Sequence, residues 1–236
     1  MRDALVWAAA APGRVDDLFV TDAVAARHPD LVDDAGRAGV GVARVTEEAA
    51  AALSDTVTPQ GVAAVCRLVV GTLDEVLATN SRLVTVLVGV ADPGNAGTVV
   101  RTSDAAGADA VVLAGDAVDP HNPKCVRASM GSLFHVPLAQ TRDVGEVVAA
   151  LRERGLTLLA ADGHGEILLG AAADPLLSAP TAWLFGNEAH GLDPDTAARA
   201  DHRVRVPIYG RAESLNLATA AAVCLYASAR AQHAPA

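Results

Sequence analysis

The sequence predicts an α/β protein with a mainly parallel sheet, preceded by a small α/β unit. Residues 83–90 (LVTVLVGV) form a nearly unbroken apolar run, which is typical of a parallel strand covered on both faces. Strand-like and helix-like segments then alternate to the end of the chain, as they do in α/β domains. The expected strands are 110–113, 134–138, 157–161, 181–185 and 203–207, and the expected helices are 95–107, 122–131, 142–154, 193–200 and 213–232. With 51% apolar residues among 236, the chain has ample material for a buried core.

The first 70 residues have their own alternation of helix and strand signals. Helices are expected over 3–11, 22–27, 29–39 and from Thr46 onward, with strand-like segments at 16–21 and 40–45 and a buried strand at 61–70. Because an α/β layer normally opens with a strand, this unit is expected to lack its first one. The polar stretch 71–82 is expected to be a linker. The predicted organisation is therefore an N-terminal domain over 1–70, a linker over 71–82 and a larger domain over 83–236.

Composition and missing motifs exclude several classes of protein. No apolar run approaches the length of a membrane span, the chain starts without a signal-peptide pattern, and the three cysteines are widely spaced. The glycine pair Gly39 and Gly41 is followed by Arg44 where a dinucleotide fingerprint needs a third glycine, and no P-loop, HExxH or GxSxG motif occurs. We therefore expect a cytoplasmic protein with no membrane association, no disulfide and no metal site.

The charge pattern leaves RNA binding open. The net charge is −10, which argues against nucleic acid, but residues 1–80 hold 6 basic and 12 acidic side chains whereas 81–236 hold 12 and 16. All but one of the basic residues are arginine, the side chain best suited to forked phosphate contacts. Local clusters comprise His121, Lys124 and Arg127, and further on Arg199, Arg203, Arg205 and Arg211. Scattered surface charge and an RNA footprint fit this pattern about equally well.

Three segments carry residues that a plain scaffold does not explain. The first, Asp92-Pro-Gly-Asn-Ala-Gly-Thr-Val-Val-Arg101, follows the strongest strand, and Asn95 is expected to cap the next helix. The second, 183–192 (WLFGNEAHGL), places Glu188 between two glycines at another strand end. The third, 206–222, leads into the last helix, with Ser214 or Glu213 as its expected cap. Ligands of open α/β sheets bind at such strand ends, although turn, loop and cap roles alone would also account for each segment.

Together these segments resemble one family. Asn95-x5-Arg101, the Gly186-Asn-Glu-x-x-Gly191 loop and Ser214-Leu-Asn216 are similar, in order and spacing, to motifs one, two and three of the SpoU (TrmH-like) ribose 2′-O-methyltransferases of the SPOUT superfamily. The resemblance covers residues 83–232. The leading unit resembles the family's N-terminal RNA substrate-binding domain.

The resemblance implies a parallel α/β domain with a C-terminal trefoil knot, a homodimer, and S-adenosylmethionine as the cofactor. It implies catalytic roles for Arg101, Asn95, Glu188, Ser214 and Asn216. Cofactor contacts are expected at Leu184, Gly186, Val206, Ile208 and Leu215. For Arg101, the role of proton acceptor and that of phosphate anchor both stay open, since a guanidinium normally remains protonated.

The expected function is methylation of a ribose 2′-hydroxyl in RNA, with 23S ribosomal RNA as the expected substrate because a separate N-terminal substrate domain is present. A tRNA 2′-O-methyltransferase and a non-catalytic RNA-binding protein on the same fold are the alternatives. Housekeeping modification and antibiotic self-resistance are not separated by the sequence. A dinucleotide-dependent oxidoreductase is disfavoured because the glycine fingerprint is missing.

Overall fold

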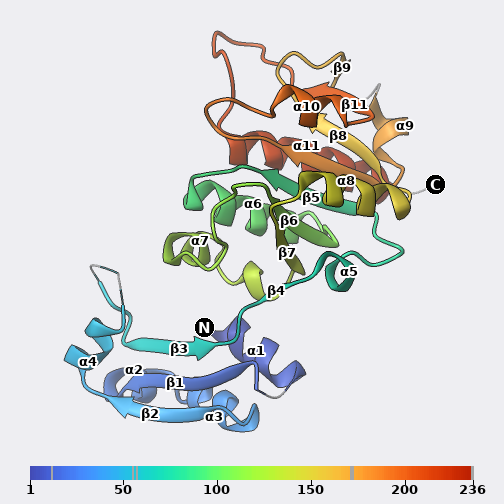
Figure 1. The fold of residues 1–236 in the computed structure, drawn as a ribbon. Coiled ribbons are helices and arrows are strands. Elements are labelled where there is room, and N and C mark those ends of the chain that lie inside the picture. Colours follow the sequence, from blue (N-terminus) through green and yellow to red (C-terminus); the bar gives the residue numbers. More distant parts are fainter. Residues whose placement is uncertain (12, 55, 57, 171–172, 235–236) are drawn as a thin grey trace. The chain divides into compact units, whose positions relative to one another are not determined.

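The computed structural model describes residues 1–11, 13–54, 56, 58–170 and 173–234. It divides into two compact units, Met1–Val69 and Val70–Ala236, each with its own sheet (Figure 1). Within these ranges no helix combines the length and the apolar character that a membrane crossing requires.

The first unit is a three-stranded sheet in the order β2-β1-β3, in which β1 is parallel to β2 and antiparallel to β3. Leu18 and Val20 of the central strand are fully buried beneath the helices. Thr21 and Thr46 begin α2 and α4 by accepting hydrogen bonds from backbone N–H groups three residues on. The elements are α1 (Arg2–Ala10), β1 (Val15–Thr21), α2 (Asp22–Arg27), α3 (Pro29–Arg37), β2 (Gly41–Val45), α4 (Glu47–Ala52) and β3 (Val62–Cys66).

The single buried strand predicted over 61–70 is wrong. β3 ends at Cys66 and is a partly exposed edge strand, and the next strand, β4 (Val70–Gly71), belongs to the sheet of the second unit. The segment 71–82, predicted as a linker, includes helix α5 (Leu73–Val76), whose Leu73 and Val76 are buried in the second unit. Apolar content without a clear alternation could not separate one long strand from two short ones.

The second unit is built on an eight-stranded sheet in the order β4-β7-β6-β5-β10-β8-β11-β9, with every pair of neighbours parallel. The parallel sheet predicted from the sequence is thus confirmed. The remaining elements are β5 (Leu83–Val88), α6 (Pro93–Ala105), β6 (Ala110–Ala114), α7 (Pro123–Ala128), η1 (Ser132–Phe134), β7 (Leu138–Thr141), α8 (Val144–Glu153), β8 (Thr157–Ala161), β9 (Ile167–Leu168), α9 (Asp174–Leu177), β10 (Thr181–Phe185), α10 (Pro194–Ala198), β11 (His202–Arg205) and α11 (Leu217–Gln232).

Side chains of alternate residues in the central strands pack in two hydrophobic cores, one on each face of the sheet. Trp183 and Phe185 of β10 pack in the core that includes α6 and α11, whereas Leu184 packs in the core that includes α8. The indole Nε1 of Trp183 donates to the Ser228 hydroxyl of α11 at 2.9 Å, which satisfies both buried polar groups. Burial on both faces explains why β5 and β10 lack polar alternation.

One predicted strand of the second unit is misplaced. Residues 134–138 were expected to be extended, but Phe134 ends the short helix η1 and β7 begins only at Leu138. Gly131, at φ 98°, starts η1 in the left-handed region that glycine adopts readily. Leu133, Val136 and Leu138 are therefore buried without forming one strand, and periodicity cannot distinguish this arrangement from a short strand.

Candidate active site at the ends of strands β5, β10 and β11

The site forms where the order of strands reverses along the chain. β5 and β10 are parallel neighbours, with Leu87 opposite Phe185, so the segments that follow them emerge at the same edge of the sheet. The chain continues from β5 to β6 and β7 on one side, whereas β8 and β11 lie on the other. Such a switch point at the carboxyl ends of parallel strands is the usual ligand-binding position in open α/β folds.

Asp92, and not Asn95 as predicted, caps the helix that carries the first motif. The Asp92 carboxylate accepts from the backbone N–H of Asn95 at 2.7 Å, and Pro93 occupies the first turn, where its missing N–H costs nothing. The other carboxylate oxygen of Asp92 accepts from Lys124 Nζ at 2.7 Å. The hydrogen bond from Lys124 and that from the Asn95 backbone are the main causes of a lowered pKa for Asp92. Asn95 therefore lies inside the first turn with its side chain available.

The second motif is a tight loop fastened to the end of β5. Asn187 and Gly191 exchange two backbone hydrogen bonds of 2.9 and 2.8 Å, and Asn187 Nδ2 donates to the Gly89 carbonyl at 2.8 Å. A Cβ atom on Gly186 would lie 2.1 Å from the Gly191 carbonyl carbon, so no larger residue fits there. Gly191 itself has φ +69°, in the region that favours glycine. The loop geometry thus depends on both glycines.

Glu188 joins this loop to the first motif. Its carboxylate accepts from the backbone N–H groups of Ala91 and Asp92 and from Asn95 Nδ2, each at 3.1 Å. Partial burial opposes ionisation, but these hydrogen bonds and one from its own backbone outweigh that effect and lower the pKa of Glu188. Glu188 is therefore ionised at neutral pH and holds the two segments together.

Asn216 of the third motif completes the arrangement. Its Oδ1 caps α11 by accepting from the backbone N–H groups of Ala218 and Thr219, at 2.9 and 3.3 Å. Its Nδ2 donates to Asn95 Oδ1 at 3.0 Å. Asn216, Asn95 and Glu188 thus form one continuous chain of hydrogen bonds through all three motifs. The predicted cap at Ser214 or Glu213 is wrong, because the cap is Asn216 and α11 begins at Leu217, three residues after Ser214.

The two other predicted catalytic residues take no part in this chain of hydrogen bonds. Arg101 is exposed on α6, fewer than two turns beyond Asn95, and it forms no hydrogen bond or ion pair with the residues that the structure describes. Ser214 is exposed in the segment before α11 and is likewise without a hydrogen bond to any described residue. Both side chains are therefore free to contact a substrate.

The predicted cofactor residues are not gathered in one closed pocket. Leu184 is buried in the core and Gly186 in its loop, whereas Val206 is half-buried and Ile208 and Leu215 are exposed. The backbone groups of residues 207–215 form no hydrogen bonds within the described part of the chain. This segment therefore offers N–H and C=O groups as well as apolar side chains to a ligand.

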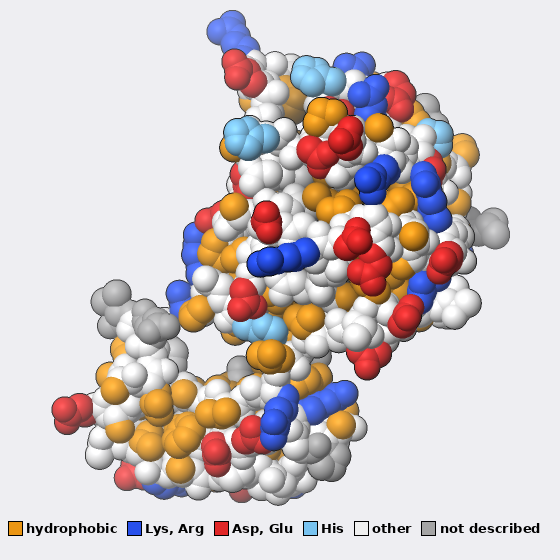
Figure 2. Space-filling model, viewed as in Figure 1, with side chains coloured by type: hydrophobic (Ala, Val, Ile, Leu, Met, Phe, Trp, Pro, Cys, Tyr) orange, Lys and Arg blue, Asp and Glu red, His pale blue; other side chains and the backbone are white. Residues whose placement is uncertain are grey.

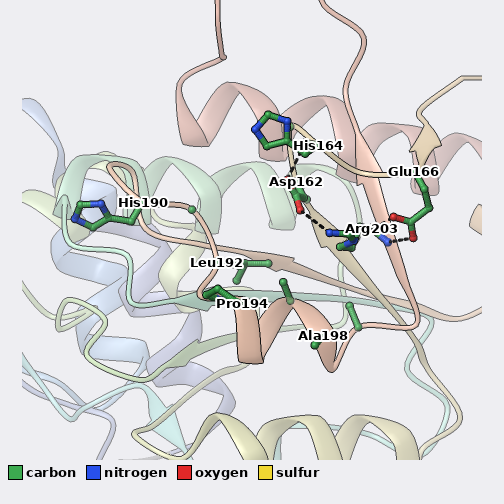
Figure 3. Close-up of a pocket in the computed structure, with 13 residues that line it drawn as sticks. Asp162, His164, Glu166, His190, Leu192, Pro194, Ala198 and Arg203 are labelled. Atoms are coloured by element: carbon green, nitrogen blue, oxygen red, sulfur yellow. Dashed lines mark hydrogen bonds and ion pairs between the residues drawn. The ribbon is translucent and has the colours of Figure 1, made fainter.

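A cavity of about 600 Å³ lies beside the second motif, between β8, α10 and β11 (Figure 3). Asp162, Glu166 and Arg203 line one side, where Arg203 Nε donates to Glu166 at 3.1 Å. Leu192 and Pro194 line the side formed by the start of α10. Its size is within the range of small-molecule sites, and Gly191 connects it to the second motif.

Three residues of the site were missed from the sequence: Asp92, Lys124 and Asn187. The pattern Asp-Pro-Gly after a strand is a recognisable helix start, with Asp as the cap and Pro in the first turn, and it would have identified Asp92. No local pattern identifies Lys124, because its contact with Asp92 spans 32 residues and depends on the packing of α7 against α6.

Comparisons with known proteins agree with this geometry. The family model described as SpoU rRNA Methylase family matches residues 82–226, and that described as RNA 2′-O ribose methyltransferase substrate binding matches residues 4–69. The chain is 37% identical over 219 residues to the 23S rRNA (guanosine(2553)-2′-O)-methyltransferase RlmP of Bacillus subtilis (strain 168), which covers 91% of this chain and 81% of that protein.

Two solved structures align over nearly the whole chain. The AdoMet-bound rRNA methyltransferase from Sinorhizobium meliloti has a TM-score of 0.81 at 27% identity, covering 100% of this chain and 86% of that one. AviRb from Streptomyces viridochromogenes in complex with AdoMet has a TM-score of 0.81 at 28% identity, covering 97% and 87%. The protein therefore belongs to the SpoU family of S-adenosylmethionine-dependent RNA 2′-O-ribose methyltransferases, as the three motifs predicted.

Proposed function

We propose that this protein methylates a ribose 2′-hydroxyl of 23S ribosomal RNA, with the three motifs as its catalytic site. The observation that carries the proposal is the hydrogen-bond chain Asn216–Asn95–Glu188, together with the unpaired guanidinium of Arg101 on the same helix as Asn95. The choice of 23S rRNA is supported by the RlmP alignment, which spans both units of this chain. A ribosomal RNA substrate in turn implies a cytoplasmic location.

Arg101 is proposed to bind the phosphate next to the target ribose and to stabilise negative charge developing on the 2′-oxygen. A guanidinium keeps its proton in proteins, so it is better suited to this role than to proton removal. Ser214 is proposed to contact the target nucleotide. Asn95 and Asn216 orient these groups, and Glu188 fixes the separation of the first two motifs through its three hydrogen bonds.

The residues around the second and third motifs fit S-adenosylmethionine. The unpaired backbone groups of 207–215 suit the hydrogen-bonding edge of an adenine, and Ile208 and Leu215 suit its faces. Leu184, Gly186 and Val206 would complete the site at the strand ends. When bound, the cofactor supplies a methyl group already activated on a sulfonium, so no metal is required for the transfer.

The trefoil knot and the homodimer are parts of the same proposal. The chain leaves β11, two strands away from β10, and returns to form α11, which packs on β10 and α6; this crossing at the strand ends supports a knotted path. The homodimer is proposed as the association that membership of this family implies. The proposed domain division is 1–70, 71–82 and 83–236.

The Arg101→Ala variant tests the proposal. Methyl transfer from labelled S-adenosylmethionine to an unmodified 23S rRNA transcript is expected to fall by about 100-fold or more, the loss typical of removing one charge-stabilising donor. Calorimetric affinity for S-adenosylmethionine is expected to stay within about twofold, because Arg101 lies outside the cofactor segments. Arg230→Ala, which removes a surface arginine near the far end of α11, is the control. Turnover near the wild-type rate in Arg101→Ala would contradict the assignment.

A further inference from the structure

A groove of about 790 Å³ includes Asn95 and Asn216 of the hydrogen-bond chain and is formed by α6, α7 and α11. Its lining includes Asn95 and Asn216, together with Lys124 and Arg127, which are one helical turn apart on α7. We call it the Arg127 groove. None of these α7 residues was given a role by the three motifs.

Tight packing of α6 and α7 builds the groove. A Cβ atom on Gly97 would lie 2.3 Å from the Cys125 carbonyl oxygen, and one on Gly94 would lie 2.9 Å from Lys124 Cε. The absence of side chains at these two positions lets the helices approach closely. The cations of α7 are thereby brought to the rim of the groove that begins at Asn95.

The charges in the groove favour an anion. Its only carboxylate among the lining residues, that of Asp92, is fully engaged by Lys124 and by the Asn95 backbone. The guanidinium of Arg127 forms no hydrogen bond or ion pair with any residue that the structure describes. Arg101 is on α6 one turn from Thr98, another lining residue, and is equally unpaired. One free guanidinium, that of Arg127, thus lines a groove that also includes the catalytic residues Asn95 and Asn216.

Other unpaired arginines differ in their surroundings: Arg142 and Arg199 line a hollow together with three aspartates, whereas Asp92 is the one carboxylate among the described residues that line the Arg127 groove. On the face shown in Figure 2, basic and acidic side chains are interspersed over the second unit, without a continuous basic surface. In the first unit, Arg2, Arg37, Arg44 and Arg67 are each paired with an aspartate. With a net charge of −10, an RNA strand is best attracted where cations are left unpaired.

We propose that the Arg127 groove binds the RNA backbone next to the methylated nucleotide, with Arg127 holding a second phosphate beyond the one assigned to Arg101. The inference rests on the proposed function, because the groove gains this meaning from the active site at its end. Thr219, which lines the groove and whose hydroxyl forms no hydrogen bond with the described residues, is a further donor to the same strand. Lys124 acts as a positioning residue, held by Asp92.

The test compares Arg127→Ala, Arg127→Lys and the control Arg230→Ala with the wild type. Each protein is titrated with an unmodified 23S rRNA transcript at several salt concentrations. Arg127→Ala is expected to bind about 3- to 10-fold more weakly, and the slope of log Kd against log salt is expected to fall by about 0.7–0.9, the value for one lost phosphate contact. Arg127→Lys keeps the charge and is expected to keep the slope. Arg230 lies about 20 Å along α11 from Leu217, so its removal is expected to change neither quantity.

Kinetics separate this groove from the catalytic role of Arg101. Arg127→Ala is expected to raise KM for the RNA with less than about a twofold change in kcat, whereas Arg101→Ala lowers kcat. An unchanged salt slope in Arg127→Ala would overturn the proposal. The proposal would also be overturned if Arg127→Ala sedimented with half the molar mass of the wild type while its salt slope stayed unchanged, because the groove would then be an interface between copies of the chain. If the wild type binds RNA but transfers no methyl group, the proposed function fails while the salt slope still decides the groove.

Discussion

Glu188→Gln is the substitution that most directly perturbs the connection between the first two motifs. Glutamine has almost the same shape, but it offers one oxygen where glutamate offers two. If that oxygen takes the place of Oε1, it accepts from the Asp92 backbone and from Asn95 Nδ2, while the new amide faces the Ala91 N–H. Two donors then oppose each other, and one hydrogen bond is lost outright.

The magnitude follows from the three contacts. A hydrogen bond to a charged acceptor contributes about 1.5–3 kcal/mol, and the two that remain lose their charge assistance. Because Glu188 is partly exposed, water offsets part of the loss, and the net cost is about 1–2 kcal/mol. For a chain of this size the melting temperature is expected to fall by about 2–8 °C. Methyl transfer is expected to fall about tenfold, which corresponds to about 1.4 kcal/mol of lost positioning of Asn95.

The fluorescence of Trp183 provides the assay for stability. It is buried in β10, next to the second motif, and the other tryptophan, Trp7, lies in the first unit. A Trp7→Phe background therefore reports unfolding of the second unit alone. Glu153→Gln, an exposed position on α8 without a hydrogen bond to any described residue, is the matched control. A melting temperature for Glu188→Gln equal to that of the control would refute the reasoning.

Three further predictions concern pH, packing and thiol reactivity. The pKa of Glu188 is lower in the folded protein than its unfolded value of about 4.5, so the stability that its carboxylate contributes is fully present above that pH. The difference in melting temperature between the wild type and Glu188→Gln is therefore expected to shrink as the pH falls below about 4.5. A difference that stays constant down to about pH 3 would contradict this. Gly97→Ala is expected to destabilise the second unit by about 1–3 kcal/mol in urea unfolding, because its Cβ would meet the Cys125 carbonyl, whereas Gly36→Ala, with nothing within 4 Å, is expected to be neutral or stabilising. Burial raises the pKa of Cys125 to about 11 and that of Cys224 to about 12. A thiol reagent at about pH 8 is therefore expected to label at most one of the three cysteines in the folded protein and all three after unfolding. Labelling of two or more cysteines in the folded protein would contradict this burial.

The sequence was sufficient for the parallel sheet and the family because both depend on local, strongly marked patterns. The apolar runs of β5 and β10 are unambiguous, and the carboxyl ends of neighbouring parallel strands must meet at one edge. The three motifs follow β5, β10 and β11, so their convergence could be expected once the strands were placed. The structure adds that Asn95, Glu188 and Asn216 are linked by direct hydrogen bonds.

What the sequence missed depends on tertiary packing. The cap of α6 falls on Asp92 instead of Asn95 because Asp92 is also held by Lys124 from another helix. The turn at 132–134 replaces part of a predicted strand because Gly131 adopts a left-handed conformation. The Arg127 groove likewise depends on the close approach of α6 and α7, which brings together residues about 30 positions apart.

The most direct test of the central claim is the position of the methyl group in the product. An unmodified 23S rRNA transcript is incubated with the protein and isotopically labelled S-adenosylmethionine, and the RNA is digested and analysed by mass spectrometry. The account predicts labelled 2′-O-methylribose at a single nucleotide, lost in the Arg101→Ala variant. A label on a base, or no label although the cofactor binds, would contradict it.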